Sequence, residues 1–381
     1  MNNSPALSNT MGSRHNYWRQ IFIAITSVAA CFIYFDAIGP SWQYFDTYYW
    51  SRPANISDHS LYVNYARYQS IAELAIADNN FGVSWFFLSI ADPYDEIQLF
   101  IVNIAFMLIA FYFYCKICLA FSMGASAYWA WLLNAFILYF ALLINKDMAT
   151  IAVILAVSWF ALQRRFGIII LMIPFVFVLR QQLFLFLAFL LFLEFPVLGG
   201  KYKSKVAVVL VAGSVAGIIA LQTFQFMALE SLGEGLTGQI TAFFLDETWL
   251  APLGVPLRIL LYIYDYASSI IPFYKGQIDA IKALRIPSII FFVAITPSFI
   301  RALRDTGRRT DFEHYRPLFS VTIAFVSALL INPQINARYL TCLVPLLILL
   351  VLIVIHKPMY QRSLRKLPIR PNGLAANRLG R

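Results

Sequence analysis

Residues 97–120 read IQLFIVNIAFMLIAFYFYCKICLA, a stretch in which Lys116 is the single charged residue. A helix of this length extends about 36 Å, at roughly 1.5 Å per residue, and the hydrocarbon core of a bilayer is about 30 Å thick. Apolar runs of this kind recur along the chain, and polar segments separate them. The stretch therefore predicts a transmembrane helix, and its repetition predicts an all-α polytopic membrane protein.

The composition of the whole chain points to the same class of protein. Of its 381 residues, 60% are hydrophobic and 13% are charged, and the mean hydropathy is +0.70. A soluble domain could not bury so large an apolar fraction. We expect about ten transmembrane helices, with interfacial or re-entrant helices in two outer loops. The expected spans cover approximately residues 20–39, 97–120, 125–144, 148–163, 166–180, 183–198, 206–228, 286–300, 317–332 and 339–356.

The basic residues indicate on which side of the membrane each loop lies. If the spans alternate, 20 of the 29 Lys and Arg residues fall on one side, together with only four of the 19 acidic residues. Short loops rich in Lys and Arg are typical of the cytoplasmic side. Both termini are therefore expected in the cytoplasm. The net charge of +10 is explained by topology and by contact with anionic membrane lipids, so no nucleic-acid partner is expected.

The chain is expected to form one membrane domain with two tails. Residues 1–19 form a polar cytoplasmic N-terminal tail, residues 20–356 the single transmembrane domain, and residues 357–381 a basic, disordered cytoplasmic tail. Two long outer loops, 40–96 and 229–285, belong to the membrane domain.

One apolar segment of the second outer loop is ambiguous. The apolar segment Leu257–Ile271 could be counted as a transmembrane span, but Arg258 and Asp265 interrupt it. A full crossing here would place the five Arg residues of 301–316 outside, against the charge rule. An in-plane or re-entrant helix is favoured, and whether the segment crosses the membrane stays open.

Polar side chains stand at three predicted outer corners of the spans. These are Lys146 with Asp147, Arg180 with Gln181 and Gln182, and Arg338 with Tyr339. Each corner could be an interfacial anchor or a helix cap, which needs no ligand. Alternatively, Arg and Lys at a membrane surface can bind a phosphate, and amide side chains suit sugar hydroxyls. Because all three corners face the same side, the second interpretation predicts one binding site for an anionic substrate.

Acidic residues of the first outer loop are the candidates for a general base. Asp46 lies in the aromatic segment 44–50, Asp36 ends the first span, and Asp58 precedes His59. A carboxylate near a reacting hydroxyl can accept its proton, and aromatic rings stack on sugar faces. Neither a DxD nor an HExxH motif occurs, so no metal site is predicted. A divalent cation is the one cofactor that these acids could hold.

This layout resembles the polytopic enzymes that assemble bacterial surface polysaccharides. The resemblance rests on the acidic, aromatic first outer loop, the Asn145-Lys-Asp corner, the Arg180-Gln-Gln corner and the sequence Asn336-x-Arg-Tyr-(x)5-Pro before the last span. Two groups fit, the EpsG/Wzy-like repeat-unit polymerases and the GT-C-type glycosyltransferases. Both use polyprenyl-linked sugar donors and a glycan acceptor at the outer face of the bacterial cytoplasmic (inner) membrane.

The resemblance also implies roles for individual residues. Arg180 and Arg338 match the outward arginines that such polymerases place near the lipid-linked pyrophosphate, and Asp36 or Asp46 matches the first-loop acid of GT-C enzymes. The chain departs from both groups, because it lacks the DxD of many GT-C enzymes and the long, Arg-rich outer loops of typical O-antigen polymerases.

Two non-enzymatic classes remain open from the residues alone. A flippase or transporter of lipid-linked sugars could line a path with the same basic side chains. Such proteins carry polar residues near the bilayer midplane, whereas the expected spans have few, chiefly Asn103, Asn134 and Gln222. A non-catalytic membrane subunit of the assembly complex is the other alternative, and it would not need the outward arginines.

Overall fold

The computed structural model describes residues 6–38, 86, 89–91, 96–142, 146–195, 201–223, 251–271, 280–305, 309–331 and 337–366. Within these ranges every regular element is a helix, which confirms the all-α prediction. The elements are α1 (Ala6–Ile38), α4 (Glu96–Ala120), α5 (Ala125–Trp129), η2 (Ala130–Leu133), α6 (Ile137–Leu142), α7 (Asp147–Leu162), α8 (Phe166–Leu171), α9 (Ile173–Leu179), α10 (Gln181–Glu194), α11 (Tyr202–Thr223), α14 (Ala251–Ala267), η4 (Ser268–Ile270), α16 (Ala280–Ala283), α17 (Ile286–Asp305), α18 (Arg309–Leu329), α19 (Ala337–Thr341) and α20 (Val344–Lys366).

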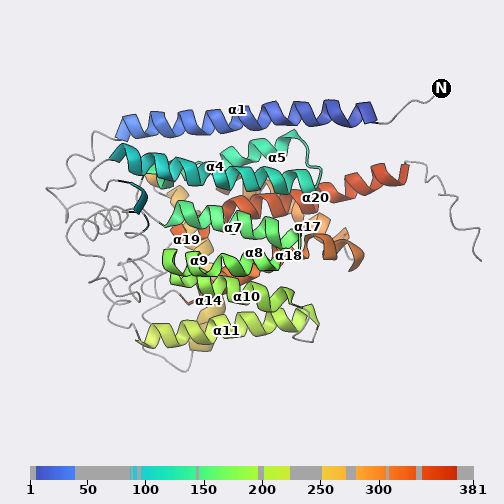
Figure 1. The fold of residues 1–381 in the computed structure, drawn as a ribbon. Coiled ribbons are helices and arrows are strands. Elements are labelled where there is room, and N and C mark those ends of the chain that lie inside the picture. Colours follow the sequence, from blue (N-terminus) through green and yellow to red (C-terminus); the bar gives the residue numbers. More distant parts are fainter. Residues whose placement is uncertain are drawn as a thin grey trace, which may run out of the picture.

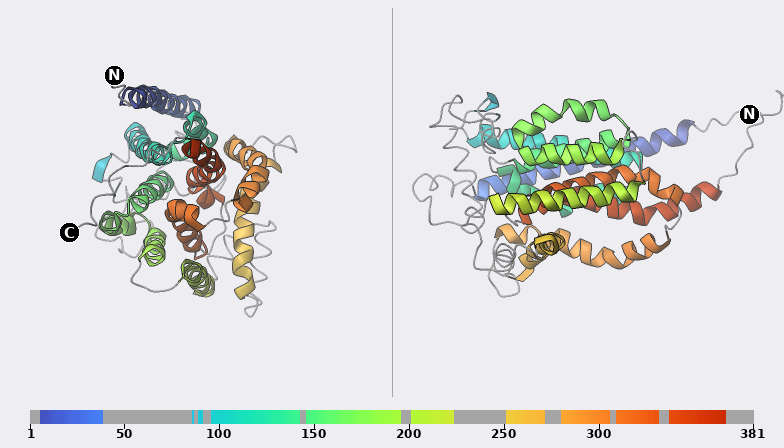
Figure 2. Two further views of the ribbon diagram at one scale, coloured as in Figure 1. Left: turned by 90° about the vertical axis from the view of Figure 1, so that its right-hand side faces the viewer. Right: turned by 90° about the horizontal axis from the view of Figure 1, so that it is seen from below.

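The long helices lie side by side and form a bundle (Figure 1). The chain runs back and forth along it, so that α4, α7 and α10 begin at the end where α1 and α11 finish (Figure 1). We call this the Asp147 end, after the first residue of α7. α14 differs from the others because it crosses the bundle axis instead of following it (Figure 2).

Several expected spans are broken helices. The segment 125–144 is divided into α5, η2 and α6, with a break at Asn134, whose φ of −89° and ψ of 58° are not helical. A turn at Met172, two residues before Pro174, separates α8 from α9. Pro174 has no backbone N–H, so it cannot form the helical hydrogen bond that would continue α8 into α9 at this point.

Two predicted tails are more helical than expected. α1 begins at Ala6, inside the segment 1–19 that the sequence predicts to be a tail. α20 continues to Lys366, although disorder is expected from 357 onward. In both places the chain continues an apolar helix, and an established helix adds residues at little cost, because nucleation is the unfavourable step. Local polarity alone therefore placed these helix ends wrongly.

Close packing of α11 on α18 depends on two glycines spaced four residues apart. A Cβ at Gly213 would lie 2.7 Å from the carbonyl oxygen of Ser327, and a Cβ at Gly217 would collide with the carbonyl oxygen of Leu330. Small residues at this spacing allow two helix backbones to approach closely. The contact fixes the end of α18, against which α14 also packs.

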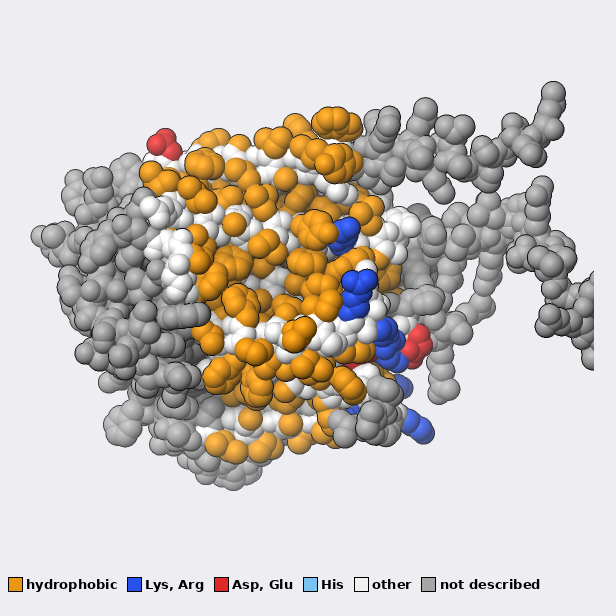
Figure 3. Space-filling model, viewed as in Figure 1, with side chains coloured by type: hydrophobic (Ala, Val, Ile, Leu, Met, Phe, Trp, Pro, Cys, Tyr) orange, Lys and Arg blue, Asp and Glu red, His pale blue; other side chains and the backbone are white. Residues whose placement is uncertain are grey.

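Large apolar side chains cover much of the outer surface. Ile33, Leu171 and Val293 are 71%, 80% and 71% exposed, and the face in Figure 3 is mainly apolar, with Lys and Arg gathered at the end opposite the Asp147 end. Two described helices, Tyr17–Ala37 and Ile97–Ala120, are long and apolar enough to cross a membrane. Five further apolar helices are shorter: Asp147–Leu162, Gln181–Glu194, Ile286–Ala302, Tyr315–Leu329 and Val344–His356.

Candidate functional site

A buried carboxylate at the start of α7 binds two arginines. The Asp147 side chain is fully buried, and its Oδ1 lies 3.3 Å from Nη1 of Arg180. Its other oxygen, Oδ2, accepts a hydrogen bond from Nε of Arg338. The two guanidinium groups are nearly as buried, with side chains 4% and 6% exposed. Pairing between the carboxylate and the guanidinium groups offsets the desolvation penalty of burying these charges.

The break between α9 and α10 positions Arg180. This residue is extended, with φ of −165° and ψ of 112°, and it serves as the N-cap of α10. Its Nε donates to Oε1 of Gln182 at 3.1 Å, which orients the guanidinium group. The guanidinium carbon lies 4.5 Å from the centre of the Tyr339 ring, a cation–π contact. Three interactions therefore hold Arg180 in one orientation.

The short helix α19 brings Arg338 and Tyr339 to the same place. Cys342 follows α19, and its Sγ lies 3.8 Å from both the backbone oxygen and Oδ1 of Asp147. The same sulfur lies 3.7 Å from the backbone oxygen of Arg338. The start of α7 and the α19–α20 turn are thus joined at several points.

Three basic side chains and one carboxylate are buried at this site. Lys146, Arg180 and Arg338 are 5%, 3% and 5% exposed, and Asp147 is the carboxylate among them. Lys146 precedes α7, and Thr150 Oγ1 donates to its backbone oxygen at 2.6 Å. Two guanidinium groups that converge on one carboxylate offer planar, charged donors of the kind that suits a phosphate or another compact anion. We name Lys146, Asp147, Arg180, Arg338 and Tyr339 the Asp147 cluster.

The remaining predicted site residues are Gln181, Asp36, Asp46 and Asp58. Gln181 begins α10 and is half-buried, while its neighbour Gln182 makes the contact with Arg180. Asp36 is exposed near the end of α1, which packs against α4, α5 and α6. Asp46 and Asp58 lie outside the described residues.

Sequence reasoning missed the contribution of α14. Nη1 of Arg258 donates to the backbone oxygen of Leu330 at 3.0 Å, and the Tyr262 hydroxyl donates to that of Leu329 at 3.4 Å. α14, which carries Tyr262, also packs against α19, which carries Arg338 and Tyr339. The sequence signal for this contact was Arg258, which interrupts an apolar run. A buried cation in such a run needs a polar partner elsewhere in the fold.

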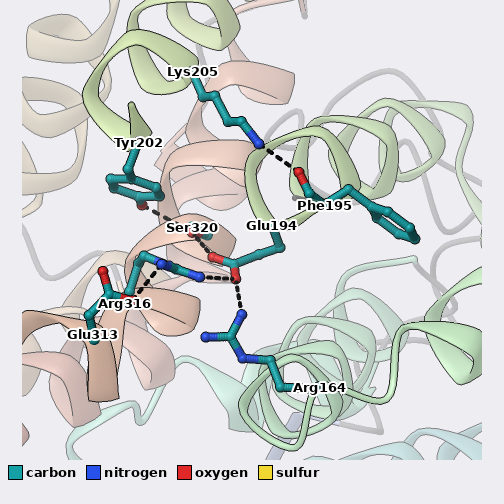
Figure 4. A network of polar contacts seen from close by, with 8 residues as sticks. All are labelled: Arg164, Glu194, Phe195, Tyr202, Lys205, Glu313, Arg316 and Ser320. Carbon is teal, nitrogen blue, oxygen red and sulfur yellow. Dashed lines mark hydrogen bonds and ion pairs between the residues drawn. The ribbon is translucent and has the colours of Figure 1, made fainter. Parts of the chain in front are cut away.

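A second polar network lies at the opposite end of the bundle (Figure 4). The buried carboxylate of Glu194, the last residue of α10, accepts from Arg164 at 3.0 Å, from Arg316 at 3.2 Å and from Ser320 at 2.5 Å. Tyr202 extends the network through a 3.0 Å contact with Ser320. Burial raises the pKa of Tyr202 to about 12, so its hydroxyl remains neutral. This network joins four helical segments.

The described residues hold no group of three or more His, Cys, Asp or Glu side chains that could bind a metal ion. Comparison with protein-family models, with curated proteins and with solved structures found no match for this chain. A function must therefore be argued from the chemistry of the Asp147 cluster and its surroundings.

Proposed function

We propose that this chain is a multi-pass protein of the bacterial inner membrane. Each of the ten expected spans overlaps with one to three consecutive helices of the bundle. Soluble monomers rarely expose a contiguous apolar surface as extensive as the one in Figure 3, whereas a surface in contact with lipid is apolar. Exposed basic residues support the orientation: Arg164, Arg165, Lys201 and Lys203 border this surface at one end, the cytoplasmic one in this proposal.

The function proposed for it is transfer or polymerisation of sugars from a polyprenyl-phosphate-linked donor at the outer face of this membrane. The observation that carries the proposal is the convergence of Arg180 and Arg338 on one buried carboxylate at the Asp147 end. Two guanidinium groups in a fixed, weakly hydrated place are suited to a phosphate with several oxygens. The end opposite to the basic loops is where a lipid-linked sugar would be used.

In the proposed reaction an acceptor hydroxyl attacks the anomeric carbon of the donor. The bond between this carbon and the phosphate oxygen breaks, and the polyprenyl phosphate leaves with the bonding electrons. Arg180, Arg338 and Lys146 stabilise the negative charge that grows on the leaving oxygen. Asp147 positions the arginines, and the face of the Tyr339 ring contacts the guanidinium group of Arg180.

The proton of the acceptor hydroxyl needs a base. Asp46 is assigned this role, with Asp36 and Asp58 as the alternatives, because these acids precede or lie within the outer loop next to the Asp147 end of α1. Aromatic side chains in the segment 44–50 would contact the sugar.

A transfer assay in proteoliposomes tests this proposal. Purified protein is given a polyprenyl-phosphate-linked sugar and a glycan acceptor, and the new glycosidic bond is detected by mass spectrometry. Transfer is expected with the wild type and with Arg165→Ala, a change at the opposite end, and its loss is expected with Arg180→Ala. Movement of the donor across the bilayer without bond formation would instead indicate a transporter.

A further inference from the structure

An apolar groove of about 400 Å³ lies between α14, α17, α18 and the α19–α20 segment. Its volume is within the range of roughly 300–1,000 Å³ that is usual for ligand sites. Tyr262 and Tyr266 line it from α14, Phe292 from α17, and Val326 from α18. The groove is distinct from the charged contacts of the Asp147 cluster, and its chemistry is different.

The groove offers no free hydroxyl to a ligand. Four of its lining residues carry a hydroxyl group, and each has an internal partner. Thr296 and Thr322 donate to the backbone oxygens of Phe292 and Leu318 at 2.6 and 2.9 Å. Tyr266 contacts Ser288 Oγ at 2.5 Å, and Tyr262 donates to the oxygen of Leu329. A sugar or head group would find no partner here, whereas a hydrocarbon chain loses nothing by entering.

One side of the groove opens to the surface of the bundle. Ile263 of α14 and Val293 of α17 line it and are 51% and 71% exposed. The exposed neighbours along α17, among them Ile290 and Ile300, are apolar as well. A chain could therefore enter sideways from the lipid, between α14 and α17, without crossing a polar surface.

The other side of the groove reaches the Asp147 cluster. Leu340 and Leu343 line the groove; Leu340 directly follows Tyr339 in the chain, and Leu343 lies three residues further on. Tyr262 belongs to the lining, and its helix α14 packs against α19, which carries Arg338 and Tyr339. An apolar groove that ends beside two buried guanidinium groups complements a molecule with a long hydrocarbon chain and an anionic head.

We infer that this groove binds the isoprenoid units next to the phosphate of the lipid-linked donor, which enters laterally between α14 and α17. The inference rests on the proposed function for the identity of the chain. It assigns α14, which crosses the bundle, the role of a wall of the lipid site (Figure 2).

Photolabelling of the full chain in nanodiscs tests the inference. The probe is a polyprenyl phosphate with a diazirine in an isoprenoid unit near the phosphate, and labelled peptides are located by mass spectrometry. Labels are expected on α14, α17 and α18. Val326→Trp, which fills the groove, should reduce them at least tenfold, whereas Val211→Trp, on the exposed face of α11, should leave them unchanged.

A rim variant covers the case in which Val326→Trp does not fold. Val293→Trp lies on the exposed edge of the groove, where added volume does not disturb the core, and it should also reduce labelling. Equal labelling of α1, α4 and α11, or full labelling in both folded variants, would overturn the inference. So would equal labelling of the groove by a phosphatidylglycerol with a diazirine in its acyl chain, which would indicate a structural lipid.

Failure of the proposed function gives a different pattern. If the groove is labelled by the polyprenyl probe but no sugar is transferred, the groove assignment holds and glycosyl transfer is wrong. If transfer persists in Val326→Trp and the label is not in the groove, the function holds and the groove assignment is wrong.

Discussion

Asp147 and Arg338 lie 191 positions apart in the chain and form a buried ion pair between the start of α7 and the short helix α19. Their side chains are 0% and 6% exposed. Long-range pairing of this kind requires the two helices to be fixed relative to each other. The same carboxylate also binds Arg180, so three distant segments of the chain depend on one side chain.

Asp147→Asn should destabilise the protein by about 3–5 kcal/mol, because the change leaves two buried guanidinium groups without their counter-ion. Thermal unfolding of the purified protein checks this, with the exposed Asp36→Asn as the control. The double variant Asp147→Asn/Arg338→Met should recover part of the loss, since one of the stranded charges is removed as well. Equal unfolding temperatures for wild type and Asp147→Asn would show that the pairing contributes little.

Arg180→Lys should lower the transfer rate by about 100- to 1,000-fold, the usual effect of losing one preorganised donor to a transition-state charge. Lysine keeps the charge but loses the planar group that binds Asp147, Gln182 and Tyr339 together. Arg165→Lys, in an exposed position at the other end, is the matched control. The test is the initial rate of sugar transfer in proteoliposomes. A rate near that of the wild type would exclude Arg180 from the mechanism.

Asp46→Asn should lower the rate of transfer by about 100- to 10,000-fold, as expected for loss of a positioned general base. Binding of the lipid-linked donor should persist, because the arginines hold the phosphate. Rates and donor affinity are measured separately. If the rate stays within a few fold of the wild type, Asp36→Asn and Asp58→Asn are tested next, and normal rates in all three would leave the reaction without a base.

Glu194→Gln should destabilise the bundle by about 3–5 kcal/mol, since it removes a buried carboxylate from Arg316 and Arg164. Arg164→Ala should cost only about 1 kcal/mol or less, because that side chain is 48% exposed. Thermal unfolding distinguishes the two variants. Sugar transfer per folded molecule should be unchanged in Arg164→Ala, since this network lies at the Glu194 end of α10 and the Asp147 cluster lies at the other end, beside Arg180.

Reporter fusions test the proposed orientation of the chain. Fusions after Arg165, Lys205, Arg309 and Arg370 should report the cytoplasm, and fusions after Ser57, Gln182 and Glu247 the outside. An outside signal at Arg309 would mean that Leu257–Ile271 crosses the membrane. Residues of the proposed site would then lie on opposite sides of the membrane.

The positions of the helices could be predicted from the sequence because long apolar runs leave few alternatives to a helix. Residues 97–120, for example, coincide with α4 within one residue. The breaks at Asn134 and Met172 were not predicted, since an apolar run has the same composition whether its helix is straight or interrupted.

The polar contacts were only partly accessible to sequence analysis. Charges at three predicted corners suggested a common site, and the structure does bring Asp147, Arg180, Arg338 and Tyr339 together. The pairing of both arginines with one carboxylate could not be foreseen, because it depends on which corners are neighbours in the bundle. The Glu194 network was missed for the same reason: its partners come from α8, α10, α11 and α18 and their flanks.

The central claim is that this chain uses a lipid-linked sugar through Arg180 and Arg338. The most direct measurement is the pool of polyprenyl-linked saccharides in bacteria from which the chain has been removed. We predict that a polyprenyl-linked saccharide accumulates, that the wild-type chain restores the normal pool, and that an Arg180→Ala chain present at normal levels does not. A pool that is unchanged by removal of the chain would contradict the claim.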